Sequence, residues 1–537
     1  MAPIQNTFVT AHDDYRYARQ EKYPQCRCRA SDATGFPRSL HSLHSLQTEG
    51  RGARRAPTTN PSMPTSLLWM APALSGGGYS SEAIAFAQGL SPLLEKRFKL
   101  RQFAEQPDEN FFNGLPLSLS RPLMLRTEFP NANPFKGTVV CHSPPDAWRP
   151  SKFPGWDELA PCPPPGASFT IGRTMYETDS VPDEWVHRCN RLDSVWVPTE
   201  FHRLSFARAG VAEHKLVVVG EPVDADFYDR SKVVTPYTPP PLKQRIGGAA
   251  EETREASPPP FRFLSVFKWE QRKGWDALLD AYFREFRPSE PVELWLKTRA
   301  FHSSDDFDGL VQGFASERGL PRGRKGRATV RVLGDDLSLE GMRDLYAAAD
   351  CFVLPSRGEG WGRPHVEAMS MSLPVIATNW SGPVACARAP DQPHTMPAVP
   401  ATRMLSKHHC AVHVFSPCIS RSRLSNNRLP GDTDLDETVG YPLEYTLEPV
   451  AAELNLPGHQ WAEPSVNHLR QLMRRVYDRR DEAKERGRAA RTRMVNEYSP
   501  EALAARAVEA VAESKRRVRE GESISLRGDG RRRKEEL

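Results

Sequence analysis

Short apolar runs alternate with helical patterns along most of this 537-residue chain. The first run, residues 66–74, ends in a glycine triplet and precedes a helical pattern, an order typical of the opening of a Rossmann-like unit. Later runs suit parallel strands that are buried on both faces. They fall at residues 137–143, 167–172, 193–198 and 215–220. The alternation predicts a doubly wound α/β domain over residues 65–236.

The same alternation returns after a break. Residues 237–260 carry prolines at both ends and a polar middle, so this segment has nothing apolar to bury and is predicted to be a linker. Strands are then predicted at residues 261–267, 292–297, 329–334, 351–356 and 373–378, and helices at 275–286, 339–349 and 365–371. Residues 261–499 are therefore expected to form a second Rossmann-like domain.

Three segments depart from this pattern. Residues 1–64 lack apolar periodicity and are expected to be a disordered leader, although the Arg- and Ser-rich part at 26–62 also resembles an organelle transit segment. Residues 386–435 keep neither a period of 2 nor one of 3.6, which is unusual inside a compact domain. Residues 500–537 are predicted to be a helix to about residue 519 and then a basic tail, whose last four letters, KEEL, resemble a retention signal for the endoplasmic reticulum.

Composition narrows the function. The net charge of +5 is too small to indicate a nucleic-acid partner, and at most peripheral membrane contact through the basic tail is expected. The 49 prolines make up about 9% of the 537 residues, against a usual ~5%. This excess implies long loops between the ordered parts. Nine cysteines form no CxxC pair or regular framework, so reduced thiols and a cytoplasmic location are expected.

The most informative motif is a pair of glutamates, Glu359 and Glu367, seven residues apart. The first lies on a glycine loop that follows a predicted strand, and the second lies in the first turns of a helix. Such a loop–helix junction presents free N–H groups and a positive dipole end to a diphosphate, and carboxylates bind sugar hydroxyls. By spacing alone, two glutamates favoured by the helix dipole are the preferred interpretation.

The residues around the two glutamates favour a ligand-binding role. Residues 356–383, SRGEGWGRPHVEAMSMSLPVIATNWSGP, resemble the E-x7-E segment of retaining GT-B glycosyltransferases in the glycosyl transferases group 1 family, of the family four type. The resemblance extends over residues 66–385 and 436–500. It implies two facing Rossmann-like domains, with the final helices crossing back onto the first. It also implies that Glu359 approaches the donor sugar, that Glu367 approaches the ribose, and that the loop of Gly360, Trp361 and Gly362 lies near the donor.

Basic residues are expected to bind the donor diphosphate. Lys273 follows a strand and precedes a helix, with Arg272 as an alternative. The family resemblance places a second cation at Lys268, where a lysine would replace the usual arginine. Because negative charge develops on the departing diphosphate, an enzyme without a metal needs such fixed cations. The Asp306–Asp308 string resembles a metal motif of the other glycosyltransferase fold, but it lies in a charged stretch, and no metal or cofactor is expected.

The first domain offers further candidates. Gly76, Gly77 and Gly78 permit close backbone approach to a donor, although a plain turn would also use them. His142 ends a predicted strand, and the family often has a histidine there near the reacting sugar; a structural histidine is the alternative. Residues 176–179 also follow a strand and are placed toward the acceptor.

The sequence thus predicts a glycosyltransferase, with a hexosyltransferase favoured. Its donor would be a UDP- or GDP-sugar, and its acceptor a glycan, a lipid or a small molecule. The irregular segment 386–435 displaces a motif that resembles the family's DG-x-TG turn, so a retained intron is hypothesised, with a genuine insertion as the alternative. If genuine, the insertion could leave a non-catalytic sugar- or nucleotide-binding protein.

Overall fold

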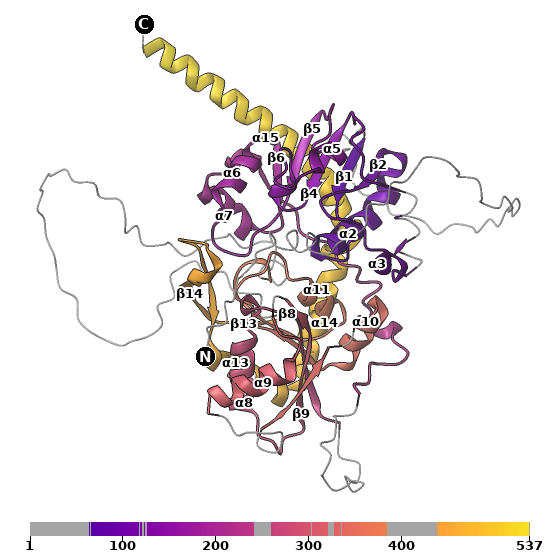
Figure 1. Cartoon of the computed structure of the whole chain (residues 1–537), viewed down its shortest axis with the longest axis vertical. Coiled ribbons are helices and arrows are strands. Elements are labelled where there is room, and N and C mark those ends of the chain that lie inside the picture. Colours follow the sequence, from indigo (N-terminus) through magenta and orange to yellow (C-terminus); the bar gives the residue numbers. More distant parts are fainter. Residues whose placement is uncertain are drawn as a thin grey trace, which may run out of the picture.

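The computed structural model describes residues 64–535 except 65, 117–118, 121–122, 124–125, 241–258, 302, 320–326, 335 and 384–437. Two α/β domains lie one above the other, and the last helix runs back along the upper, N-terminal one (Figure 1). The leader, most of the linker and the irregular segment lie outside the described residues, so the expectations for them remain predictions.

The N-terminal domain contains a seven-stranded parallel sheet in the order β3-β2-β1-β4-β5-β6-β7. Its strands are β1 (Leu67–Ala71), β2 (Phe98–Gln102), β3 (Thr127–Glu128), β4 (Thr138–His142), β5 (Phe169–Arg173), β6 (Ser194–Val197) and β7 (Leu216–Val218). Every residue of β1 and β4 is buried, as expected for strands covered on both faces. Strand β2 was not predicted because charged Lys99 and Arg101 interrupt its apolar pattern; Arg101 is buried through its ion pair with Glu128.

Helices cover both faces of this sheet. They are α2 (Gly78–Leu94), α3 (Glu109–Asn113), α5 (Trp156–Leu159), α6 (Asp183–Asn190), α7 (Glu200–Ala209) and, from the far end of the chain, α15 (Pro500–Glu535). Ala504 and Val508 of α15 join the N-terminal core, so the predicted return of the last helix is confirmed. The helix continues to Glu535, beyond the predicted end near residue 519, so the expected tail is helical.

The C-terminal domain repeats the same topology. Its six parallel strands run in the order β10-β9-β8-β11-β12-β13. They are β8 (Phe261–Trp269), β9 (Val292–Ala300), β10 (Thr329–Leu333), β11 (Cys351–Leu354), β12 (Val375–Thr378) and β13 (Tyr441–Leu443). The helices are α8 (Trp275–Glu285), α9 (Phe307–Glu317), α10 (Leu339–Ala348), α11 (Arg363–Ser370), α13 (Val466–Asp478) and α14 (Arg480–Glu497). Two Rossmann-like domains are therefore present, and the predicted fold class is confirmed.

Each sheet reverses its strand order at one point, and ligands of doubly wound folds bind at such points beside the carboxyl ends of the strands. The reversal lies between β1 and β4 in the first sheet and between β8 and β11 in the second. The loops that follow these four strands are therefore the first places to search for a site.

An antiparallel hairpin of β14 (Tyr445–Pro449) and β15 (Gln460–Pro464) connects the domains. The N–H of Gln460 donates to the carboxylate of Asp179 at 2.7 Å, and the side chains of Thr178 and His459 lie 2.7 Å apart. Phe201 of α7 packs against the small core of the hairpin. The sequence did not predict this hairpin, because its strands alternate only weakly between apolar and polar residues.

One disulfide corrects the expectation of reduced cysteines. Cys141 of β4 is bonded to Cys162, which lies in the loop after α5. The pair is 21 residues apart, so it leaves no local spacing pattern in the sequence. Cys189 and Cys351 are free and buried. Among the described residues, no helix is both long and apolar enough to cross a membrane.

Candidate active site between the two domains

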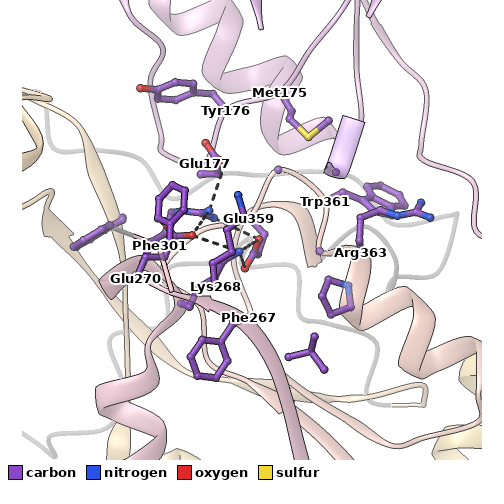
Figure 2. A pocket seen from close by; sticks show the side chains of 18 of the residues that line it. Met175, Tyr176, Glu177, Phe267, Lys268, Glu270, Phe301, Glu359, Trp361 and Arg363 are labelled. Carbon is purple, nitrogen blue, oxygen red and sulfur yellow. Dashed lines mark hydrogen bonds and ion pairs between the residues drawn. The ribbon is translucent and has the colours of Figure 1, made fainter. Parts of the chain in front are cut away.

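A cavity of about 480 Å³ lies between the two domains and is lined by both. Its lining follows the sheet reversal points: Tyr79 comes from the segment after β1, the stretch 268–273 spans the end of β8, and the stretch 359–364 follows β11. A fourth group, residues 175–178, follows β5 in the N-terminal domain. Figure 2 shows Met175, Tyr176 and Glu177 approaching from the opposite side to Glu359.

The centre of the C-terminal wall is an ion pair between Lys273 and Glu359. The Lys273 ammonium lies 2.8 and 2.9 Å from the two oxygens of the Glu359 carboxylate. Gly274 is the N-cap residue of α8 and adopts a φ of +64°, and a β-carbon there would lie 2.0 Å from the carbonyl oxygen of Pro355. Because only glycine permits this close approach, it lets the loop after β8 press against the loop after β11.

Arg272 adds a second cation to this pair. It donates to the carbonyl oxygen of Gly358 at 2.6 Å, and its guanidinium lies 3.4 Å from the Glu359 carboxylate. It also lies 2.8 Å from the carboxylate of Glu270 and 3.8 Å from that of Glu177 in the other domain. Arg272 thus connects the two walls of the cavity electrostatically.

Glu359 is ionised at neutral pH. Burial by itself would raise the pKa of this carboxyl, but Lys273 and Arg272 lower the pKa from 4.5 to about 2. Among the described residues, six basic and four acidic side chains line the cavity. This excess of positive charge suits an anionic ligand with at least two negative charges.

The other residues predicted on the donor side also line the cavity. The Lys268 ammonium lies over the ring of Phe301, 4.5 Å from its centroid. Gly360 lies so close to Met175 that an added β-carbon would be 2.3 Å from the sulfur atom. Trp361 is buried beside the cavity, and Gly362, the N-cap residue of α11, adopts a φ of +98°. The start of α11 therefore faces the cavity through Gly362, Arg363 and Pro364.

Glu367 is not brought to the lining. Its carboxylate accepts a hydrogen bond of 2.9 Å from the hydroxyl of Tyr346. Burial raises the pKa of Glu367, an effect that Arg363 partly offsets. The predicted contact with a ribose therefore remains a prediction.

The structure places His142 outside the cavity lining. This side chain is completely buried and does not line the cavity. One ring nitrogen lies 2.9 Å from the carboxylate of Glu82, and the other accepts a hydrogen bond from the indole of Trp69. Glu82 also binds Arg173 at 2.7 Å. His142 is thus part of a buried polar network, which fits the structural alternative, and the predicted role near the reacting sugar remains a prediction.

The glycine triplet contributes less than predicted. Gly78 lines the cavity, but Gly76 and Gly77 do not. Gly76 adopts a φ of +77° beside the ring of Phe111, and Gly77 precedes the first residue of α2. Two of the three glycines therefore form the turn itself, as the plain-turn alternative requires.

Several lining residues were missed at the sequence level. The most informative are Tyr79, Glu221, Arg299, Arg363 and Trp461. Glu221 follows β7 within three residues and could have been found by the same strand-end rule that selected His142. Trp461 comes from the hairpin and left no signal in the pattern.

No cluster of three metal-ligating side chains occurs among the described residues. Asp306 of the Asp306–Asp308 string caps α9 by accepting a hydrogen bond from the N–H of Gly309 at 2.9 Å. This local role accounts for the acidic residue at that position.

These features define the class: two Rossmann-like domains with a ligand cavity between them form a GT-B fold. Residues 259–393 match the family model described as Glycosyl transferases group 1. The match agrees with the predicted family over this segment, which includes Lys273 and Glu359, and supports a glycosyltransferase.

Solved structures resemble the chain at low identity. HepE from Anabaena, solved with UDP and glucose, is 13% identical with a TM-score of 0.49, over 83% of this chain and 99% of that protein. A glycosyltransferase from Rickettsia africae is 16% identical with a TM-score of 0.49, over 84% and 98%. Sucrose-phosphate synthase from Thermosynechococcus elongatus is 14% identical with a TM-score of 0.46, over 83% and 98%. A search of curated proteins finds no match.

Proposed function

We propose that this protein transfers a hexosyl group from a UDP- or GDP-sugar to a glycan, lipid or small-molecule acceptor, with retention of configuration and without a metal ion. The observation that carries the proposal is the cluster of Lys273, Arg272 and Glu359 at the sheet reversal point, facing a second domain across a cavity. The family match over residues 259–393 covers this same cluster.

The C-terminal wall would hold the donor. Lys273, Arg272 and Lys268 offer positive charge to a diphosphate, and the positive end of the α11 dipole faces the same cavity. In the transfer, the bond from the anomeric carbon to the diphosphate breaks and the diphosphate takes the electron pair. The acceptor oxygen forms the new bond to the anomeric carbon, and its proton passes to the departing diphosphate. Fixed cations beside the departing diphosphate stabilise the charge that develops there.

Glu359 has a different role in this proposal. As an anion in a buried site, its carboxylate would accept hydrogen bonds from sugar hydroxyls and stabilise positive charge near the anomeric carbon. The N-terminal wall, including residues 176–178, would face the acceptor. Localisation in the cytoplasm belongs to the same proposal.

A panel of nucleotide sugars tests the proposal. Thermal shift with UDP-glucose, UDP-N-acetylglucosamine, GDP-mannose and ADP-glucose should identify one ligand that stabilises the fold by about 2.7 kcal/mol at 100 times its Kd. Donor hydrolysis, followed by NMR of the released sugar, should then give the anomer of the donor, and excess EDTA should leave the rate unchanged. Stabilisation without hydrolysis or transfer would instead favour a non-catalytic binding protein.

A further inference from the structure

Among the described residues, the hairpin and the segment that connects its two strands present only apolar side chains to the cavity. Val450, Leu454 and Leu456 come from the connecting segment, and Trp461 comes from β15. Val450 and Trp461 are buried, whereas Leu454 and Leu456 are only partly buried. The two leucines therefore keep surface that a molecule in the cavity can reach.

These side chains continue an apolar surface of the N-terminal domain. Tyr176 and Trp185 line the cavity from that domain, and their ring centroids lie 5.0 Å apart. Leu456 packs against the core that contains these two rings and also against the small core of the hairpin. We call the combined surface the apolar wall, and its residues are Val450, Leu454, Leu456, Trp461, Tyr176 and Trp185.

Contacts on two sides hold the hairpin in this position. The N–H of Gln460 donates to the carboxylate of Asp179 at 2.7 Å, and the N–H of Asp179 donates to the carbonyl oxygen of Gln460 at 3.2 Å. On the other side, the N–H of Ala462 donates to the carbonyl oxygen of Arg357 at 2.9 Å. Figure 1 shows β14 beside the boundary between the two domains. The two leucines therefore keep a defined position beside residues 176–178, which line the same cavity.

The cationic side chains of the lining lie elsewhere. They come from β8, from the turn after it, from β9 and from the start of α11, and are Lys268, Arg272, Lys273, Lys297, Arg299 and Arg363. An anionic diphosphate therefore finds its compensating charges on that side of the cavity. The apolar wall is left for a different part of the reaction, and in this fold that part is the acceptor.

The exposed surface of the apolar wall suits an apolar molecule better than a glycan. Tyr176 and Trp461 are 3% and 4% exposed, so their rings offer almost no face to a sugar, and the reachable surface is that of the leucines. Sugar hydroxyls placed against leucine lose hydrogen bonds to water without replacement. An alkyl chain or an aromatic ring instead gains free energy, because both surfaces are removed from water.

We propose that the acceptor is an apolar alcohol, in which the reacting hydroxyl is carried by an alkyl chain or an aromatic ring, and that Leu454 and Leu456 are specificity-determining residues for it. This inference rests on the proposed function and narrows its acceptor. Ligand pockets commonly combine an apolar lining with a few polar groups that orient the ligand. Glu177, which is next to Tyr176 and 3.8 Å from Arg272, is such a group at the edge of the apolar wall.

Binding of matched alcohols to the full-length protein tests the proposal. Calorimetry compares 1-octanol and 2-naphthol with glucose and maltose, each with and without UDP or GDP. At least one apolar alcohol should bind tenfold or more tightly than either sugar, and the better of the two distinguishes an alkyl from an aryl acceptor. Equal or tighter binding of a sugar, or no binding of either apolar alcohol, would overturn the proposal.

The proposed function is tested by separate probes. If the protein binds none of UDP, GDP, UDP-glucose and GDP-mannose, the proposed function fails, whatever the alcohols do. If a donor is found, mass spectrometry of the products should show a kcat/KM for an apolar alcohol at least tenfold above that for glucose or maltose. Preferred transfer to a sugar would leave the proposed function intact and overturn the apolar acceptor.

Variants of the two leucines locate the binding. Leu454→Ser and Leu456→Ser should each weaken binding of the apolar alcohol about fivefold or more and change binding of the nucleotide less than twofold, because only the apolar wall is altered. Leu456→Met keeps an apolar side chain of similar volume and should stay within twofold of wild type.

Leu447→Ser is the matched control. Leu447 is also partly buried against the hairpin core, but it lies outside the cavity lining. Its replacement should leave the affinity for the apolar alcohol within twofold of wild type. The two serine variants are independent, so either one decides if the other does not fold. An unchanged affinity in the serine variants, or an equal loss in Leu447→Ser, would overturn the proposal.

Discussion

At the scale of single residues, the site depends on charges that are buried next to one another. Glu359 is 6% exposed, and its charge is compensated by Lys273 and Arg272. Removing one partner of a buried pair costs far more than the pair itself contributes, since the remaining charge is left without compensation. Substitutions here therefore affect folding as well as binding, and each needs a control for stability.

Lys273→Ala should weaken nucleotide-diphosphate binding by about 1.5–3 kcal/mol, the usual worth of a hydrogen bond to a charged group. Calorimetry with UDP and GDP measures this loss. Lys99→Ala is the control, because Lys99 pairs with Glu128 away from the cavity. The double variant Lys273→Ala with Glu359→Gln no longer carries an uncompensated buried carboxylate, so its folding should be restored. The loss of nucleotide affinity should persist in this double variant. Unchanged affinity in both variants would remove Lys273 from the site.

The pH dependence of stability reports on Glu359. Its pKa in the folded protein is about 2, below the ordinary 4.5, so its ionised form stabilises the fold above about pH 4.5. This stabilisation is lost as the pH falls from 4.5 toward 2. Urea unfolding of wild type and Glu359→Gln at pH 7, 5, 4 and 3 should show a difference that is constant down to pH 5 and then shrinks. A difference that does not change between pH 5 and pH 3 would contradict the ion pair.

At the scale of elements, helix α15 completes a domain that is far from it in the sequence. It packs on α2, and its Ala504 and Val508 are fully or almost fully buried in the N-terminal core. The approach is close because α2 has glycine at position 89, where a β-carbon would lie 1.9 Å from the carbonyl oxygen of Pro500. The N-terminal domain therefore depends on the C-terminal end of the chain for part of its core.

Gly89→Ala should destabilise the protein by about 1–3 kcal/mol, because the new methyl group overlaps backbone and not a flexible side chain. Gly313→Ala is the matched control in α9, where nothing lies within 4 Å of the added carbon. That change should stabilise the protein by about 0.4–1 kcal/mol, because alanine lowers the conformational entropy of the unfolded chain. Urea unfolding of both variants measures the two effects, and the same sign in both would refute the packing argument.

At the scale of the whole molecule, the two domains meet through backbone as well as side chains. A β-carbon at Gly358 would lie 2.0 Å from the carbonyl oxygen of Glu177, across the domain boundary. The hairpin adds a second contact, where Gln460 binds Asp179. These contacts hold the two walls of the cavity close together. A substitution at Gly358 should therefore change the distance between the walls before it disturbs the fold of either domain.

Gly358→Ala should lower kcat about tenfold or more while nucleotide affinity falls less than threefold. The added methyl group holds the N-terminal wall away, whereas the diphosphate contacts lie within the C-terminal domain. Gly334→Ala is the control, since nothing surrounds a β-carbon there. The measurement is steady-state turnover beside calorimetry with the nucleotide. An unchanged kcat would show that closure tolerates the methyl group.

Sequence patterns alone predicted much of this protein. The strands buried on both faces, the two α/β domains and the cavity positions of Lys273, Glu359 and Trp361 follow from apolar runs, glycine turns and the family-like segment. These are local features, since strand and helix periods and loop–helix junctions are written in neighbouring residues.

Only the tertiary structure decided the rest. It buried His142 against Glu82, joined Cys141 to Cys162, and brought Gly220 next to Trp361. Each of these pairs joins segments that are distant in the chain, and no local pattern states which distant segments meet. The physical reason is that charge compensation and burial are properties of a packed environment. The same histidine, cysteine or glutamate has a different role when its neighbours come from another strand or another domain.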